Sequence, residues 1–157
     1  MSGALKILSL LALVVGALAV AGCGGGDERE ERNAYVRQLN AAQQEFADNA
    51  SLVSQERAPA SIAQYRRTLE RFEATIASFT AKLQKIEVPD EVRDEHARLI
   101  DALKSFGQDF NRVTAALKNP NARKLSEAKR AISIATNRAN LRIEAAAAAI
   151  DSKLERG

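Results

Sequence analysis

The chain has 157 residues, with 4% aromatic residues, no tryptophan and one cysteine, which excludes an intramolecular disulfide framework. Its 23 basic and 20 acidic residues are interspersed and give a formal net charge of +3, so the sequence lacks the concentrated basic patch of a nucleic-acid-binding protein. Alanine and long unbranched residues dominate, and they favour an all-α fold because they lose little side-chain freedom in a helix.

The first 22 residues have the pattern of a targeting sequence. Lys6 precedes an apolar run over residues 7–21, which is shorter than the about 20 residues that a transmembrane helix needs. A cationic start, a short apolar segment and small residues after it describe a secretory signal peptide. The end of this segment resembles the lipobox of bacterial lipoproteins, and it reads Leu18-Ala19-Val20-Ala21-Gly22-Cys23.

The lipobox resemblance implies a lipid anchor at Cys23. In that family the chain is cut before the cysteine, here between Gly22 and Cys23, and the cysteine sulfur receives a diacylglyceryl group. The new amino group is often acylated as well, and two or more acyl chains give stable membrane attachment where one gives only marginal binding. We therefore expect the membrane to be a partner through lipidated Cys23. The expected location is the outer face of the bacterial cell membrane, or the periplasm where an outer membrane is present.

The expected domain organisation follows from this cleavage. We predict a signal peptide at 1–22, a lipidated flexible tether at 23–28 and a helical domain at 29–157. The glycines at 24–26 support the tether because glycine resists helix formation.

Four apolar stripes with helical spacing run through the rest of the chain. Between residues 62 and 86, and again between residues 92 and 117, the stripe positions alternate by three and four, which indicates helices packed along their whole length. Pro59, Pro89 and Pro120 stand at the breaks, and Ser61 with Gln64 has capping-box spacing. We predict helices over about 29–55, 61–87, 89–118 and 120–155. Their short connections predict an antiparallel, up-down-up-down four-helix bundle.

The composition of the stripes leaves two functions open. The phenylalanines are expected to fill the interior, because aromatic side chains bury the most area, and they are Phe46, Phe72, Phe79, Phe106 and Phe110. The last helix is rich in alanine, which lets neighbouring backbones approach closely. One interpretation is a tightly packed interaction or scaffold module. The alternative is a binding protein that holds a small apolar or lipid ligand within the bundle.

The sequence offers few groups for catalysis or metal binding. His96 is the only histidine, and the residue three positions before it is Arg93 instead of the glutamate of a di-iron motif. Cys23 is expected to be acylated, and the carboxylates of Asp94 and Glu95 lie in a charge-mixed segment where we expect them to be solvated. We therefore predict no catalytic residue, no metal site, no cofactor and no enzymatic activity.

His96 occupies a stripe position, and in an antiparallel bundle the same end would hold Tyr35. We expect a partly buried imidazole whose nitrogen meets Tyr35, a carboxylate or water. Desolvation would lower the pKa of His96, and its protonation in acid would then loosen this end. The pair His96 and Tyr35 is therefore a candidate pH-sensitive core, beside the simpler interpretation of a buried histidine that only packs.

A lipid at Cys23 would also orient the bundle. The first helix would start at the membrane, so the connections near 55–61 and 118–124 would lie at the outward end, where basic residues gather. The candidate partner-binding tip consists of Arg57, Lys118, Arg123 and Lys124. Such a tip would fit an acidic envelope protein or an anionic wall polymer, while the alternative is that these charges only complement helix ends and aid solubility. No nucleic acid is expected as a partner.

Overall fold

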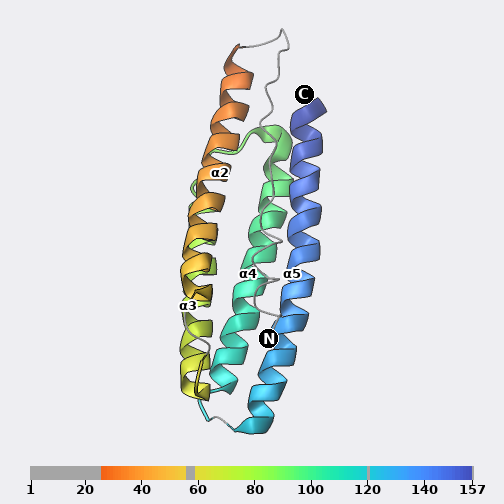
Figure 1. Ribbon diagram of the computed structural model, residues 1–157. Helices are drawn as coiled ribbons and strands as arrows, with labels where there is room; N and C mark the ends of the chain where they lie inside the picture. The colour runs from red at the N-terminus through yellow and green to blue at the C-terminus, as the bar shows by residue number, and fades with distance from the viewer. Residues whose placement is uncertain (1–25, 56–58, 120, 157) are drawn as a thin grey trace.

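A computed structural model describes residues 26–55, 59–119 and 121–156 of the chain, and every regular element within these ranges is helical. The elements are α2 (Gly26–Ser54), α3 (Ile62–Leu83), the short 3₁₀ helix η1 (Asp90–Val92), α4 (Arg93–Ala116) and α5 (Ala122–Arg156). The four long helices lie side by side (Figure 1). The predicted all-α class is therefore confirmed. The signal peptide and the lipobox lie outside the described residues.

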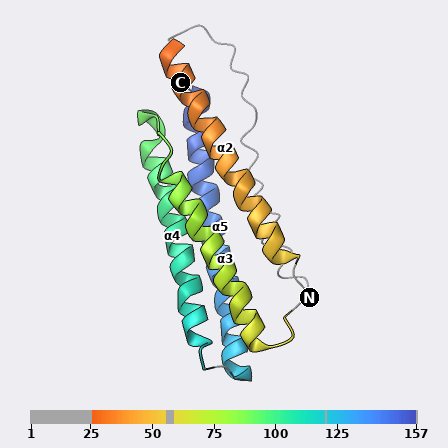
Figure 2. The ribbon, with the colours of Figure 1, turned by 90° about the vertical axis from the view of Figure 1, so that its left-hand side faces the viewer.

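The helices pack mainly on their neighbours in the chain. The contact of α4 with α5 is the most extensive, followed by α3 with α4 and α2 with α3. Figure 2 shows α2 alongside α3, tilted in the same direction. In Figure 1 the start of α2, the α3–α4 connection and the last turn of α5 lie at one end, which we call the Tyr35 end. The start of α3, the end of α4 and the start of α5 lie at the other, which we call the Lys118 end.

The apolar stripes account for the core. On the third stripe every predicted position from Val92 to Leu117 is buried, so the spacing by three and four identified that face correctly. Five phenylalanine rings form a continuous chain between α2, α3 and α4, with ring centroids 4.8 to 6.4 Å apart. They are Phe46, Phe72, Phe79, Phe106 and Phe110, of which Phe72 is half-buried. Burying a side chain of this size stabilises a fold by about 1.5–3 kcal/mol.

The junction between α3 and α4 differs from the prediction. α3 ends at Leu83 instead of residue 87, because the backbone tightens into i to i+3 hydrogen bonds from the N–H groups of Lys85 and Ile86. Pro89 precedes η1, and the regular helix begins only at Arg93. The predicted helix start at residue 89 is therefore a turn of 3₁₀ helix in which proline still supplies its fixed φ.

The starts of the other helices follow their capping residues. The Ser61 hydroxyl accepts a hydrogen bond from the Gln64 N–H at 3.2 Å, as the capping-box spacing predicts. α5 starts two residues later than predicted, because the Asn121 side chain accepts a hydrogen bond from a first-turn N–H at 2.8 Å and caps the helix. Pro120 lies outside the described residues. α2 begins at Gly26, three residues earlier than predicted.

Candidate functional site

Side chains that are both polar and buried come together at the Tyr35 end. Glu95 and His96 are two of the five buried polar or charged residues in the described ranges, and they are adjacent at the start of α4. Tyr35 of α2 is fully buried beside them, with its ring edge-on to the His96 ring at 5.6 Å. Among the described residues, buried polar side chains that contact one another are therefore most concentrated at this end.

His96 is 4% exposed, and both of its ring nitrogens are hydrogen-bonded. Nε2 lies 3.0 Å from the carbonyl oxygen of Leu83, the last residue of α3, and a carbonyl oxygen only accepts. Nε2 therefore carries the proton of the neutral ring, and Nδ1 accepts a hydrogen bond from the Tyr35 hydroxyl at 3.0 Å. We call these three residues the Tyr35–His96–Leu83 network. Through it one imidazole connects α2, α3 and α4.

The protonation states fit this pattern of donors and acceptors. Burial lowers the pKa of His96, although the hydrogen bond to the Leu83 carbonyl partly opposes the shift. Burial also raises the pKa of Tyr35, with a further contribution from the carboxylate of Asp151 on α5. Both groups are therefore neutral at neutral pH, which is the state in which the hydroxyl donates to Nδ1.

Glu95 corrects one prediction made from the sequence. Asp94 is exposed as expected, but the Glu95 side chain is only 7% exposed and pairs with Lys153 of α5 at 2.8 Å. The hydrogen bond from Lys153 holds the pKa of Glu95 below its usual range, and burial opposes this shift. The prediction of a solvated Glu95 was wrong because its position flanks the buried stripe, where side chains reach the neighbouring helix.

A second ion pair extends the polar contacts to η1. The Arg32 side chain on α2 lies 2.7 Å from the Glu91 carboxylate. A partly exposed ion pair of this kind contributes about 0–1 kcal/mol. Losing one partner of a buried hydrogen bond costs more, about 1–3 kcal/mol, because the other partner stays buried and unpaired. The stability of this end therefore depends more on the Tyr35–His96–Leu83 network than on the pair of Arg32 with Glu91.

The predicted partner-binding tip is described in part. Arg57 lies outside the described residues, Lys118 and Arg123 are exposed, and Lys124 is half-buried. Arg123 pairs with Glu127 at 2.9 Å, one turn further along α5. Part of the positive charge expected at the Lys118 end is therefore neutralised locally.

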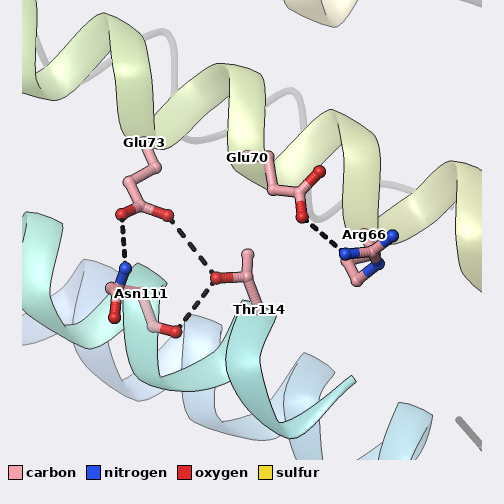
Figure 3. A network of polar contacts seen from close by, with 5 residues as sticks. All are labelled: Arg66, Glu70, Glu73, Asn111 and Thr114. Carbon is pink, nitrogen blue, oxygen red and sulfur yellow. Dashed lines mark hydrogen bonds and ion pairs between the residues drawn. The ribbon is translucent and has the colours of Figure 1, made fainter. Parts of the chain in front are cut away.

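A polar group between α3 and α4 was missed by the sequence reasoning (Figure 3). The Asn111 side chain donates to one oxygen of Glu73 at 2.9 Å. The Thr114 hydroxyl donates to the Asn111 carbonyl at 2.9 Å and lies 3.5 Å from the second Glu73 oxygen. Beside it on α3, Arg66 pairs with Glu70 at 2.8 Å. Polar side chains beside a stripe carry no periodic signal, so nothing in the spacing identified this group.

The described residues thus define an all-helical protein whose buried polar side chains mostly connect one helix to the next. Within these residues no three His, Cys, Asp or Glu side chains are grouped as a metal ion would require. Searched over the same ranges, no helix has the length and apolar character needed to cross a membrane. The chain matches no family model, no curated protein and no solved structure.

Proposed function

We propose that the chain is a non-enzymatic lipoprotein of the bacterial cell envelope, anchored through acylated Cys23, whose helical domain is an interaction or scaffold module. The observation that carries the proposal is the position of the lipobox cysteine relative to the helical domain. Cys23 stands three residues before Gly26, where α2 begins. Three residues span at most about 11 Å, so a lipid at Cys23 would hold the Tyr35 end close to the membrane surface.

The proposed architecture is an up-down-up-down four-helix bundle that stands on this anchor. It is supported by the dominance of contacts between helices that follow one another in the chain. The shared position of the α2 start and the α5 end in Figure 1 also supports it, because helices with short connections alternate in direction. Such a bundle is a rigid spacer between a membrane and a partner.

The use of the buried polar groups supports a structural role over a catalytic one. A general acid or base must come within hydrogen-bond reach of a substrate. Both ring nitrogens of His96 are hydrogen-bonded to neighbouring helices, and the carboxylate of Glu95 is paired with Lys153. Neither group would meet a substrate unless the helices separated.

We place the partner-binding surface of this module at the Lys118 end, which would point away from the membrane. The support is the exposure of Lys118 and Arg123, and the expected partner is an acidic envelope protein or an anionic wall polymer. The pairing of Arg123 with Glu127 reduces the charge available there, so Lys118 is the residue on which this surface depends most.

The lipid anchor is tested by intact-mass measurement of the protein extracted from its native membrane. We expect a chain that begins at Cys23 and carries acyl groups, and we expect Cys23→Ala to lose the acyl mass and to keep residues 1–22. The matched control is Gly25→Ala, which leaves the lipobox unchanged and should be processed normally. A native protein without acyl mass at Cys23 would refute the anchor.

The tip is tested by co-sedimentation with isolated cell walls. The charge-reversed variant combines Lys118→Glu, Arg123→Glu and Lys124→Glu. The matched control reverses three exposed charges elsewhere and combines Arg37→Glu, Lys85→Glu and Lys104→Glu. Loss of binding in the first variant alone supports a partner-binding surface at the Lys118 end. Equal binding of both variants refutes it.

One observation favours the alternative of an apolar or lipid ligand held between the helices. The Thr136 hydroxyl on α5 is buried, and among the described residues it has no hydrogen-bond partner. A polar atom of a bound molecule would satisfy it. Mass spectrometry of protein extracted without stripping detergents tests this alternative, because a retained stoichiometric lipid beyond the acyl anchor would be detected.

A further inference from the structure

α5 has an exposed apolar strip on the side opposite to its buried face. Ile134 is 52% exposed and Leu141 is 70% exposed. They are seven residues apart, so they share one face of the helix at a separation of about 10.5 Å. Exposed alanines extend the strip in both directions. The α5 outer strip consists of Ala131, Ile134, Leu141, Ala145 and Ala148, and the exposed Arg138 stands on the same face between Ile134 and Leu141.

Nothing in the described part of the molecule covers this strip. Figure 1 shows α5 at the edge of the group of four helices, with α4 next to it and with α2 and α3 on the far side of α4. The inward face of α5 is occupied by its contact with α4, which is the most extensive one between two helices. The strip therefore needs an occupant from outside the described residues, or it stays in water.

The charges around the strip point to an anionic occupant. Between residues 130 and 148 there are three exposed arginines, Arg130, Arg138 and Arg142, and one acidic residue, Glu144. Arg138 is 3.7 Å from Asp109 of α4, so Arg130 and Arg142 are the arginines most available to a partner.

The same contrast holds between whole helices. α5 contains eight basic and four acidic residues, a net charge of +4. α2 contains three basic and six acidic residues, a net charge of −3. The positive charge of the protein is thus concentrated on α5, and a second copy of this strip would be repelled by it.

We propose that the α5 outer strip lies against an anionic lipid surface. Aliphatic side chains flanked by arginines are the composition of helices that bind in the plane of a membrane interface. Ile134 and Leu141 would enter the headgroup region, and the arginines would extend to lipid phosphates while their stems cover apolar surface.

The geometry of the anchor makes this contact easy to reach, and this step rests on the proposed acylation of Cys23. Ala148 lies eight residues before the end of α5, which is about 12 Å from the Tyr35 end. A bundle held at that end would bring the strip to the surface by leaning towards α5. Since the anchor makes the contact intramolecular, a weak surface affinity is enough to populate it.

The test uses the absence of tryptophan from the chain. The variant Leu141→Trp places a single indole on the strip, at a position exposed enough to accept it. The matched control is Leu52→Trp on α2, whose native side chain is 62% exposed. Each protein is reconstituted into vesicles of phosphatidylcholine alone or with phosphatidylglycerol, and the indole emission and its quenching by brominated lipid are recorded.

We expect a blue shift and strong quenching for Leu141→Trp in the anionic vesicles, and neither effect for Leu52→Trp. Replacing Arg130 and Arg142 by glutamine in the Leu141→Trp protein should weaken the contact. Each arginine near an anionic surface changes partitioning about fivefold, so the double replacement should change it about 25-fold.

Three results would overturn the proposal. The first is an indole at position 141 that stays unquenched in anionic vesicles. The second is quenching that is equal with and without phosphatidylglycerol. The third is a blue shift that grows with protein concentration in the absence of vesicles, since it would identify a second copy as the occupant. An unacylated Cys23 is detected separately by intact mass, and the same protein is then added to preformed vesicles for the same readout.

Discussion

Acidification should destabilise the Tyr35 end through His96. Burial lowers the pKa of this imidazole in the folded protein below its ordinary value of 6.5, which it regains on unfolding. Between these two values the unfolded chain binds a proton that the folded protein does not. The free energy of unfolding therefore falls as the pH is lowered from 6.5 towards the folded-state pKa, and His96 contributes no pH dependence above this window.

The size of the effect follows from the Tyr35–His96–Leu83 network. One proton gives a slope of at most about 1.4 kcal/mol per pH unit within the window. Protonation turns Nδ1 into a donor to the Tyr35 oxygen, so the buried hydroxyl hydrogen loses its acceptor at a cost of about 1–3 kcal/mol. The hydrogen bond from Nε2 to Leu83 survives and limits the loss.

Two neighbouring carboxylates also make the free energy of unfolding depend on pH, but one does so at lower pH and the other in the opposite direction. The lowered pKa of Glu95 makes it lose stabilisation only when the pH falls below its ordinary value of 4.5. Burial and the nearby Glu155 raise the pKa of Asp151, so its protonation favours the folded state as the pH falls. A loss of stability on acidification between pH 6.5 and 5 therefore comes from neither carboxylate and is assigned to His96.

The assay is urea unfolding followed by circular dichroism at several pH values between 5 and 8. The control is His96→Gln, whose amide can still donate to the Leu83 carbonyl but does not titrate. We expect the native protein to lose stability on acidification below pH 6.5 and the variant to show a flat profile over that range. Parallel profiles of the two proteins, or an NMR titration of His96 at its ordinary pKa, would refute the reasoning.

Three further substitutions test the packing by urea unfolding at pH 7. Tyr35→Phe removes the donor to His96 and should destabilise the fold by about 1–3 kcal/mol; an unchanged midpoint would mean that the hydroxyl bond is not needed. Gly107→Ala should stabilise α4 by about 0.5–1 kcal/mol, because the added Cβ meets only Ile76 at an ordinary 3.7 Å, and destabilisation would contradict this contact. Phe110→Ala should cost about 3–5 kcal/mol, and a loss below 1 kcal/mol would show that its ring is not part of the core.

The helices could be predicted because each one buries a single face over many turns. The spacing from Val92 to Leu117 repeats often enough to identify the inward face of α4 without any other information. The helix ends were predicted less well, because they depend on single hydrogen bonds. The spacing predicted a start of α5 at residue 120, and only the hydrogen bond from a first-turn N–H to the Asn121 side chain shows that Asn121 is the cap and that the helix begins at Ala122.

The site could be predicted only where the stripe itself contained a polar residue. His96 stands on the stripe, and an antiparallel arrangement predicts that Tyr35 lies at the same end. Their side chains are 3.0 Å apart in the structure. The second partner of His96 is the backbone carbonyl of Leu83. Every residue has such a carbonyl, so the sequence does not indicate which one is used. The pairing of Glu95 with Lys153 depends on how far α4 and α5 are rotated about their own axes, and spacing does not define that rotation.

The two proposed surfaces make different demands on the same anchor. A partner at the Lys118 end needs the bundle to stand away from the membrane, whereas the α5 outer strip needs it to lean. If Cys23 is acylated as proposed, a spacer that spans at most about 11 Å would leave the domain little freedom besides this change of tilt. The charges favour one direction, because an anionic surface repels α2, with its net charge of −3, and attracts α5, with its net charge of +4. Salt weakens this attraction, since exposed charges are screened within about 10 Å at 0.1 M ionic strength. The ionic strength outside the cell would then set the tilt of the bundle, and with it the distance at which Lys118 meets a partner.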